Sequence, residues 1–174
     1  MEITGKTIIN QLKKIIITQW IETKVKYEKT MENGLQKKVT EPYLVDALSF
    51  TEAEKRITEE IAPFMSGEFS VSAVKKSNIT ELFWSDAESD DKWYKVKVNF
   101  ITINERTMQE KKTASYMMVQ ASDFHTALKH FDEGMKGTMT DYQIVAITET
   151  AIMDVYKFDA ERKAGAKEAT CADE

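Results

Sequence analysis

Two tryptophans, each followed by a lysine at the same spacing, are the side chains of this chain best suited to bind a ligand. Trp20 is followed by Lys24, and Trp93 by Lys97. Because strand residues alternate between two faces, each tryptophan shares a face with its lysine. Three more side chains, from the strands expected to pair with these, could join the two faces: Lys38, Lys112 and Tyr116. An indole ring flanked by ammonium groups can stack on a base and neutralise phosphates, so the pattern predicts a nucleotide or single-stranded nucleic acid as ligand.

The same tryptophans have two other interpretations. They can anchor the contact between two packed sheets, with the lysine stems covering the rings. They can also be the contact anchors of a protein-interaction module. Burial of Trp93 between the sheets would favour the structural interpretation and exclude the nucleic-acid one.

The residues around these tryptophans occur twice, at a nearly constant offset, and this sets the expected architecture. Trp20-Ile-Glu-Thr-Lys-Val-Lys-Tyr27 returns as Trp93-Tyr-Lys-Val-Lys-Val-Asn-Phe100. Two later segments return in the same order: Phe50-Thr-Glu-Ala53 as Phe124-His-Thr-Ala127, and Phe69-Ser-Val-Ser-Ala-Val74 as Tyr142-Gln-Ile-Val-Ala-Ile147. We therefore expect an α+β protein of two tandem β-β-α-β repeats with pseudo-twofold symmetry, in which one helix covers each antiparallel sheet.

Each repeat carries local signals for its turns and helices. Asn33-Gly34 predicts a type I′ hairpin turn, Ser49 and Glu52 form a capping box, and Asp123 caps the second helix. The final strands, at 68–84 and 141–158, lose their alternation near 75–78 and 148–150, which predicts a bulge or a break into two short strands. The helix faces expected to be buried are Ala53, Ile57, Ile61 and Phe64 in the first repeat, and Phe124, Ala127, Leu128, Phe131 and Met135 in the second.

These elements divide the chain into segments. The repeats occupy residues 20–85 and 92–158, and an acidic linker at 86–91 joins them. Residues 1–19 are an N-terminal helix or extension: an added packing element, a helix for a partner, or residues added by an upstream start codon. Residues 159–174 form a polar tail, either frayed helix or disordered.

Composition narrows the class of protein. The chain has 174 residues, 42% of them hydrophobic, and a formal net charge of −5. This acidic balance argues against a nonspecific duplex-DNA binder. Cys171, the one cysteine, lies in the polar tail, so no disulfide framework is expected. The sequence has neither a signal-peptide pattern nor an apolar run of about 20 residues, so we expect a soluble, cytoplasmic protein with no membrane partner.

No other motif predicts a catalytic or metal site. Gly134-Met-Lys-Gly137 has the spelling of a phosphate-clamping GxxG loop, but a helix end followed by a turn explains both glycines. His125 and His130 point in different directions on a helix, so they cannot share a metal, and both are expected to be solvated. The linker carboxylates lack the pattern of a calcium loop and are also expected to be solvated: Asp86, Glu88, Asp90 and Asp91. We expect no metal, no cofactor and no catalytic residue, since nucleophile elbows, phosphate loops and dinucleotide fingerprints are absent from the sequence.

A resemblance to a known family is carried by three segments: Lys24-Val-Lys-Tyr-Glu-Lys-Thr-Met-Glu-Asn-Gly-Leu-Gln-Lys-Lys-Val-Thr-Glu-Pro-Tyr-Leu-Val-Asp-Ala-Leu-Ser-Phe-Thr-Glu-Ala-Glu54, Lys111-Lys-Thr-Ala-Ser115 and Gly134-Met-Lys-Gly-Thr-Met139. Together they resemble domain-of-unknown-function family 4494, over both repeats. The resemblance implies a bacterial or phage intracellular setting, in Bacteroidota or their phages, including crAss-like phages. It brings no activity and no catalytic residues. Thr23 stands where the resemblance places a cysteine, which removes the case for a shared catalytic thiol.

We therefore expect a non-catalytic binding protein, with a nucleotide or single-stranded nucleic acid as ligand. The alternative is a protein-interaction module, for example a phage-encoded factor acting on a host protein. An enzyme of unknown type is the third possibility.

Overall fold

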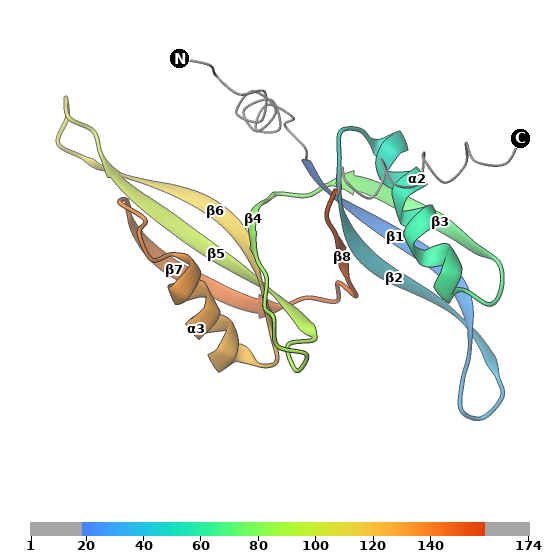
Figure 1. The fold of residues 1–174 in the computed structure, drawn as a ribbon. Coiled ribbons are helices and arrows are strands. Elements are labelled where there is room, and N and C mark those ends of the chain that lie inside the picture. Colours follow the sequence, from blue (N-terminus) through green and yellow to red (C-terminus); the bar gives the residue numbers. More distant parts are fainter. Residues whose placement is uncertain (1–18, 159–174) are drawn as a thin grey trace, which may run out of the picture.

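The fold consists of two four-stranded sheets and two α-helices, as a computed structural model describes it for residues 19–158 (Figure 1). The expected helix or extension before Gln19 and the tail at 159–174, with Cys171, lie outside the described residues. The mixed content of helix and strand confirms the α+β class. In chain order the elements are β1 (Gln19–Thr30), β2 (Gln36–Ala47), α2 (Phe50–Ile61), the 3-10 turn η1 (Ala62–Phe64), β3 (Phe69–Lys76), β4 (Ile79–Phe83), β5 (Lys92–Ile103), β6 (Glu110–Ala121), α3 (Phe124–Gly134), β7 (Asp141–Glu149) and β8 (Val155–Tyr156).

The long hairpin of each sheet follows the predicted alternation. β1 pairs with β2 in antiparallel fashion, with Ile21 opposite Val45, and β5 pairs with β6, with Tyr94 opposite Val119. Because side chains alternate along a strand, one face of each hairpin packs against its helix. The other face carries the charged residues and also buried residues such as Leu44 and Trp93. The β1 residues on the face toward the helix include Ile21, Thr23 and Val25.

The last strands cross from one sheet to the other. The chain breaks after β3, as the lost alternation predicted, but β4 then joins β6 in parallel, with Phe83 opposite Val119. Near the end of the described chain, β8 joins β2 in parallel, with Tyr156 opposite Val45. The strand orders are β3-β1-β2-β8 and β4-β6-β5-β7. Both sheets are therefore mixed, which corrects the expectation of antiparallel sheets, and Figure 1 shows β4 and β8 lying along the sheets that they join.

Capping side chains begin both helices, as predicted. Ser49 Oγ accepts a hydrogen bond from Glu52 N at 3.1 Å, and Glu52 Oε2 accepts one from Leu48 N at 3.0 Å. In the second helix, Asp123 Oδ1 accepts from Thr126 N at 2.8 Å. These bonds satisfy amide groups that have no partner within the first helical turn.

Helix α2 packs on the first sheet, where Ile57 and Ile61 contact the cluster that contains Val25. Phe64 was expected on the same face, but its side chain is 80% exposed. The reason is local: Pro63 has no N–H with which to continue the helix, and the chain tightens into η1, which turns Phe64 outward.

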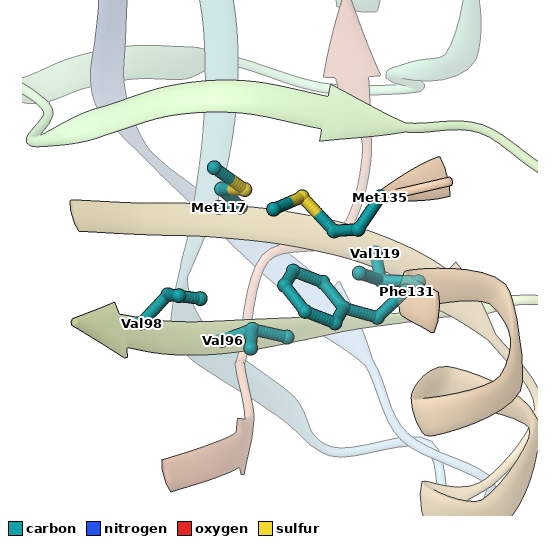
Figure 2. Close-up of a cluster of buried hydrophobic side chains, with 6 residues drawn as sticks. All are labelled: Val96, Val98, Met117, Val119, Phe131 and Met135. Atoms are coloured by element: carbon teal, nitrogen blue, oxygen red, sulfur yellow. The ribbon is translucent and has the colours of Figure 1, made fainter. Parts of the chain in front are cut away.

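Helix α3 packs on the second sheet through Phe131, which lies next to Val96, and Met135 at the helix end joins the same buried cluster (Figure 2). Phe124 and Leu128 were expected in the same stripe, but they are 52% and 40% exposed. The buried stripe is therefore narrower than predicted, and these two side chains lie at its margin.

The first hairpin turn differs from the prediction. Gly34 has a φ of 78°, but Asn33 does not have the positive φ that a type I′ turn requires. Gly34 N donates to Met31 O at 2.9 Å and Met31 N donates to Leu35 O at 2.8 Å, so the loop has three residues and ends on a left-handed glycine.

The two glycines of the GxxG spelling have separate structural roles. Gly134 ends α3, and a Cβ added there would lie 2.5 Å from the ring of Phe83 on β4. Gly137, with a φ of 88°, makes the turn that follows. These roles support the helix-end interpretation of the motif.

Candidate functional site

Trp93 lies in the contact between the two sheets. Its side chain is 2% exposed and packs with Leu44 and Val155 of the first sheet and with Met118 of the second. The Trp84 ring meets it edge-on, with ring centroids 5.1 Å apart. The ring of Trp93 is therefore closed to a nucleic-acid base, which is the outcome that favours the structural interpretation.

The residues predicted around Trp20 do not gather into one site. Trp20 is half-buried against the same inter-sheet cluster, and Lys24 is exposed on the outer face of β1. Lys38 lies farther along the hairpin, opposite Glu28, with its Nζ 3.9 Å from the Glu28 carboxylate.

The predicted residues of the second sheet are only partly brought together. Tyr116 is half-buried, and the Nζ atoms of Lys95 and Lys97 lie 4.7 Å and 6.0 Å from its ring centroid. Lys112 lies farther along, opposite Ile101. The tyrosine ring is thus already in contact with cations of the chain itself.

A different group of side chains, missed in the sequence, forms a recessed site at the first sheet. Two tyrosines share one carboxylate: Tyr27 Oη donates to Glu41 Oε1 at 3.0 Å, and Tyr43 Oη donates to Glu41 Oε2 at 3.1 Å. A third tyrosine, Tyr156, stacks on Tyr43 with ring centroids 6.1 Å apart. The cluster is hereafter called the tyrosine pocket.

The strand register positions these side chains. Glu41 and Tyr43 are two positions apart on β2 and so share its inner face, and Tyr27 on β1 is the diagonal neighbour of Glu41. This part could have been found in the sequence from the hairpin register. Tyr156 could not, because it reaches the pocket only through the crossing of β8 to β2, where it lies opposite Val45.

The site is a concavity of about 360 Å³ at the surface of the first sheet. Its described lining contains aromatic rings, flexible apolar side chains and two carboxylates, and none of these residues is basic. The lining residues are Tyr27, Glu41, Tyr43, Ile61, Phe64, Met65, Met153, Asp154 and Tyr156. Rings and carboxylates together attract a positively charged organic group.

Burial keeps the tyrosine hydroxyls protonated in alkaline solution. It raises the pKa of Tyr43 above its ordinary value, with the charge of Glu41 as the next cause. Burial also raises the pKa of Tyr156 to about 12, helped by the charge of Asp154. The pKa of Tyr27 is raised by burial and then by its bond to Glu41. Tyrosine hydroxyls are protonated at neutral pH even at their ordinary pKa of about 10, and the raised pKa values keep these three protonated in alkaline solution as well. Two of them fix the orientation of the Glu41 carboxylate.

The second sheet has no such cluster at the same register positions. Phe100 stands in place of Tyr27, Ser115 in place of Glu41, and Met117 in place of Tyr43. Phe83 stands in place of Tyr156, and its ring packs edge-on against Phe131 at 5.8 Å. The same arrangement of strands is thus built without these polar groups, so the fold alone does not require them.

Comparison with known proteins decides the family. The family described as Domain of unknown function (DUF4494) matches residues 19–158, which include all the strands and helices described above. The chain belongs to the DUF4494 family. No curated protein and no solved structure matches it.

In this DUF4494 protein, Thr23 is fully buried on β1, opposite Tyr43 of the tyrosine pocket. The family resemblance places a cysteine at this position. Thr23 Oγ1 donates to Tyr43 O at 3.4 Å, so this residue belongs to the supporting structure of that strand. Between residues 19 and 158, neither α-helix is long and apolar enough to cross a bilayer.

Asp90 of the linker and His130 of α3 differ from two further expectations. Asp90 was expected to be solvated but is 4% exposed, and it accepts a hydrogen bond from Ser85 Oγ. His130 is half-buried, with Nδ1 3.0 Å from Gln120 O and 3.7 Å from the Asp90 carboxylate. His125 is exposed, as predicted. Ser85 contacts Asp90 rather than the histidine, so the three side chains do not have the order of a nucleophile activated by a base.

Proposed function

We propose that this DUF4494 protein is a non-catalytic protein-interaction module, and that the tyrosine pocket is its docking site. The observation that carries the proposal is a pair of exposed apolar side chains at the opening of the pocket. Phe64 is 80% exposed there and Met153 is 52% exposed, beside a recess that holds paired tyrosine hydroxyls and carboxylates. Exposed apolar side chains around a recessed polar pocket suit an anchor side chain of a partner, with the adjoining partner surface lying on Phe64 and Met153.

The proposal includes an internal duplication with pseudo-twofold symmetry. The equal strand orders support it, as do the equal registers, in which Ile21 opposite Val45 corresponds to Tyr94 opposite Val119. After such a duplication, one half can keep an apolar core while the other half acquires a binding site. Met117 in the second sheet and Tyr43 in the first occupy the same register position, and they differ in this way: Met117 belongs to an apolar core and Tyr43 to the pocket.

We do not propose a nucleotide or single strand as the ligand. The Trp93 ring is buried, and the tyrosine pocket is lined by Glu41 and Asp154, which would repel phosphates. The setting we propose, the cytoplasm of a bacterium or of a phage-infected bacterium, rests on the family resemblance.

The proposal is tested by selecting peptides from a random library on the full chain and measuring their affinities by fluorescence anisotropy. Phe64→Ala and Met153→Ala should each weaken the selected peptides, by about tenfold if each side chain contributes a typical anchor contact. Met139→Ala is the control, because Met139 is 99% exposed and does not line the pocket. Peptides that bind equally well to all three variants, or oligonucleotides that bind where no peptide does, would refute the proposal.

A further inference from the structure

We infer that the group bound in the tyrosine pocket is an organic cation, a guanidinium or an alkylated ammonium. This inference rests on the proposed docking site and names the chemistry of its ligand. Three tyrosine rings and the ring of Phe64 line the recess together with two carboxylates. The negative faces of aromatic rings attract a cation within about 6 Å of the ring centroid, and they do so most strongly where water is excluded.

The carboxylates give the pocket its charge. Glu41 is held from two sides by Tyr27 and Tyr43, so its oxygens have a fixed direction before any ligand arrives. Asp154 also lines the recess, and its Oδ1 accepts from Val155 N at 2.7 Å. A fixed carboxylate loses little freedom on binding, which favours a charge-assisted hydrogen bond to a ligand.

Outside the pocket, cations of the chain lie over aromatic rings. The described lining residues of the pocket include no such cation. The guanidinium of Arg56 lies 4.2 Å from the ring centroid of Phe158, and Lys95 lies 4.7 Å from that of Tyr116. In the pocket, rings and carboxylates meet without a basic side chain of the lining. None of the described lining residues supplies the cation that complements these groups, so we assign that cation to the ligand.

The size of the recess limits the ligand. A volume of about 360 Å³ is near the lower end of small-molecule sites, which span about 300–1,000 Å³. Such a site takes a group as large as one long side chain rather than a dinucleotide. Because the pocket is proposed as a docking site for a protein, we assign the cation to an arginine or modified lysine side chain of the partner.

The test uses the full chain and matched neutral and charged probes, followed by NMR of the tyrosine rings and by calorimetry. Acetyl-arginine amide should bind, while acetyl-citrulline amide, which has nearly the same shape without the charge, should bind at least about tenfold more weakly. Acetyl-trimethyllysine amide and choline are the second pair of probes, and they separate a partner side chain from a free small cation. Tighter binding of choline than of both amino-acid amides would refute a partner side chain as the source of the cation.

Two carboxylate variants locate the binding. Glu41→Gln should weaken the cation by about tenfold. Glu149→Gln removes the same charge on the second sheet, where Glu149 faces Lys92 at 3.5 Å, and it should leave binding unchanged. Asp154→Asn is a second pocket variant that leaves the tyrosine bonds to Glu41 intact, so a folding defect in Glu41→Gln would not remove the test.

Equal binding of arginine and citrulline amides, or equal losses in Glu41→Gln and Glu149→Gln, would overturn the cation inference. Failure of the inference is distinguishable from failure of the docking site. If selected peptides depend on Phe64 and Met153 but contain no basic anchor, the docking site stands and its ligand chemistry is wrong. If no peptide depends on the pocket, the proposed function itself is wrong.

Discussion

Replacing Trp93 with alanine removes the largest fully buried side chain of the contact between the sheets. Trp93 is 2% exposed and packs with residues of both sheets, among them Leu44 and Met118. Truncating a buried tryptophan costs about 3–5 kcal/mol, because the cavity left behind adds to the lost transfer free energy. In a domain of this length each kcal/mol lowers Tm by about 2–4 °C, so Tm should fall by roughly 6–20 °C.

The assay is calorimetry together with urea unfolding, in which the midpoint should fall while the slope stays unchanged. Trp84→Ala is the matched control: the residue type is the same, but the side chain is 47% exposed and meets Trp93 only edge-on. The control should lose clearly less than Trp93→Ala, and about 0.5–1.5 kcal/mol of its loss comes from the ring contact. If Trp93→Ala melts within about 2 °C of the natural chain, Trp93 does not hold the sheets together. The nucleic-acid interpretation would then return, and oligonucleotide binding would have to be measured.

Three further changes test the cores and the pocket. Phe131→Ala should lower the free energy of unfolding by about 3–5 kcal/mol, because the ring is fully buried. A loss below about 1 kcal/mol in urea unfolding would show that the buried face of α3 is misassigned. Gly134→Ala should lower the free energy of unfolding by about 1–3 kcal/mol although alanine favours helices, because the added Cβ would lie 2.5 Å from the Phe83 ring. Gly67→Ala is the control and should be nearly neutral in the same melts, because nothing lies within 4 Å of the Cβ added there. Since burial raises the pKa of Tyr156 from 10.0 to about 12, the stability that its neutral form contributes is complete below pH 10 and is lost as pH rises through 12. An absorbance titration of tyrosinate should therefore show late-ionising tyrosines, with one fewer in Tyr156→Phe. Ionisation of all tyrosines in one step near pH 10 would contradict this.

Local features of the fold were predictable because their causes are local. The caps at Ser49 and Asp123 depend on a side chain and amides within a few residues, and both occur as expected. The inward alternation of Ile21 and Val25 follows from the pleat and from side-chain polarity alone. The hairpin turn at Asn33 was predicted wrongly, since the same residues fit a three-residue loop that ends on a left-handed glycine.

The candidate site was only partly predictable. Register places Tyr27, Glu41 and Tyr43 together on one hairpin, and this could have been inferred from the sequence. The exposure of Phe64 could not, because the helical periodicity continues up to it and only the tight turn at Pro63 directs it outward.

The sequence by itself determined the order of strands and helices, the face of each hairpin that packs against its helix and the places where the last strands break. The tertiary structure alone decided which sheet receives each broken end. The open edges of β2 and β6 offer similar backbone donors and acceptors, so the side-chain pattern of β4 or β8 does not distinguish between them. The crossing brings Tyr156 onto Tyr43 and packs Val155 against Trp93, and so it both completes the pocket and closes the tryptophan to a ligand.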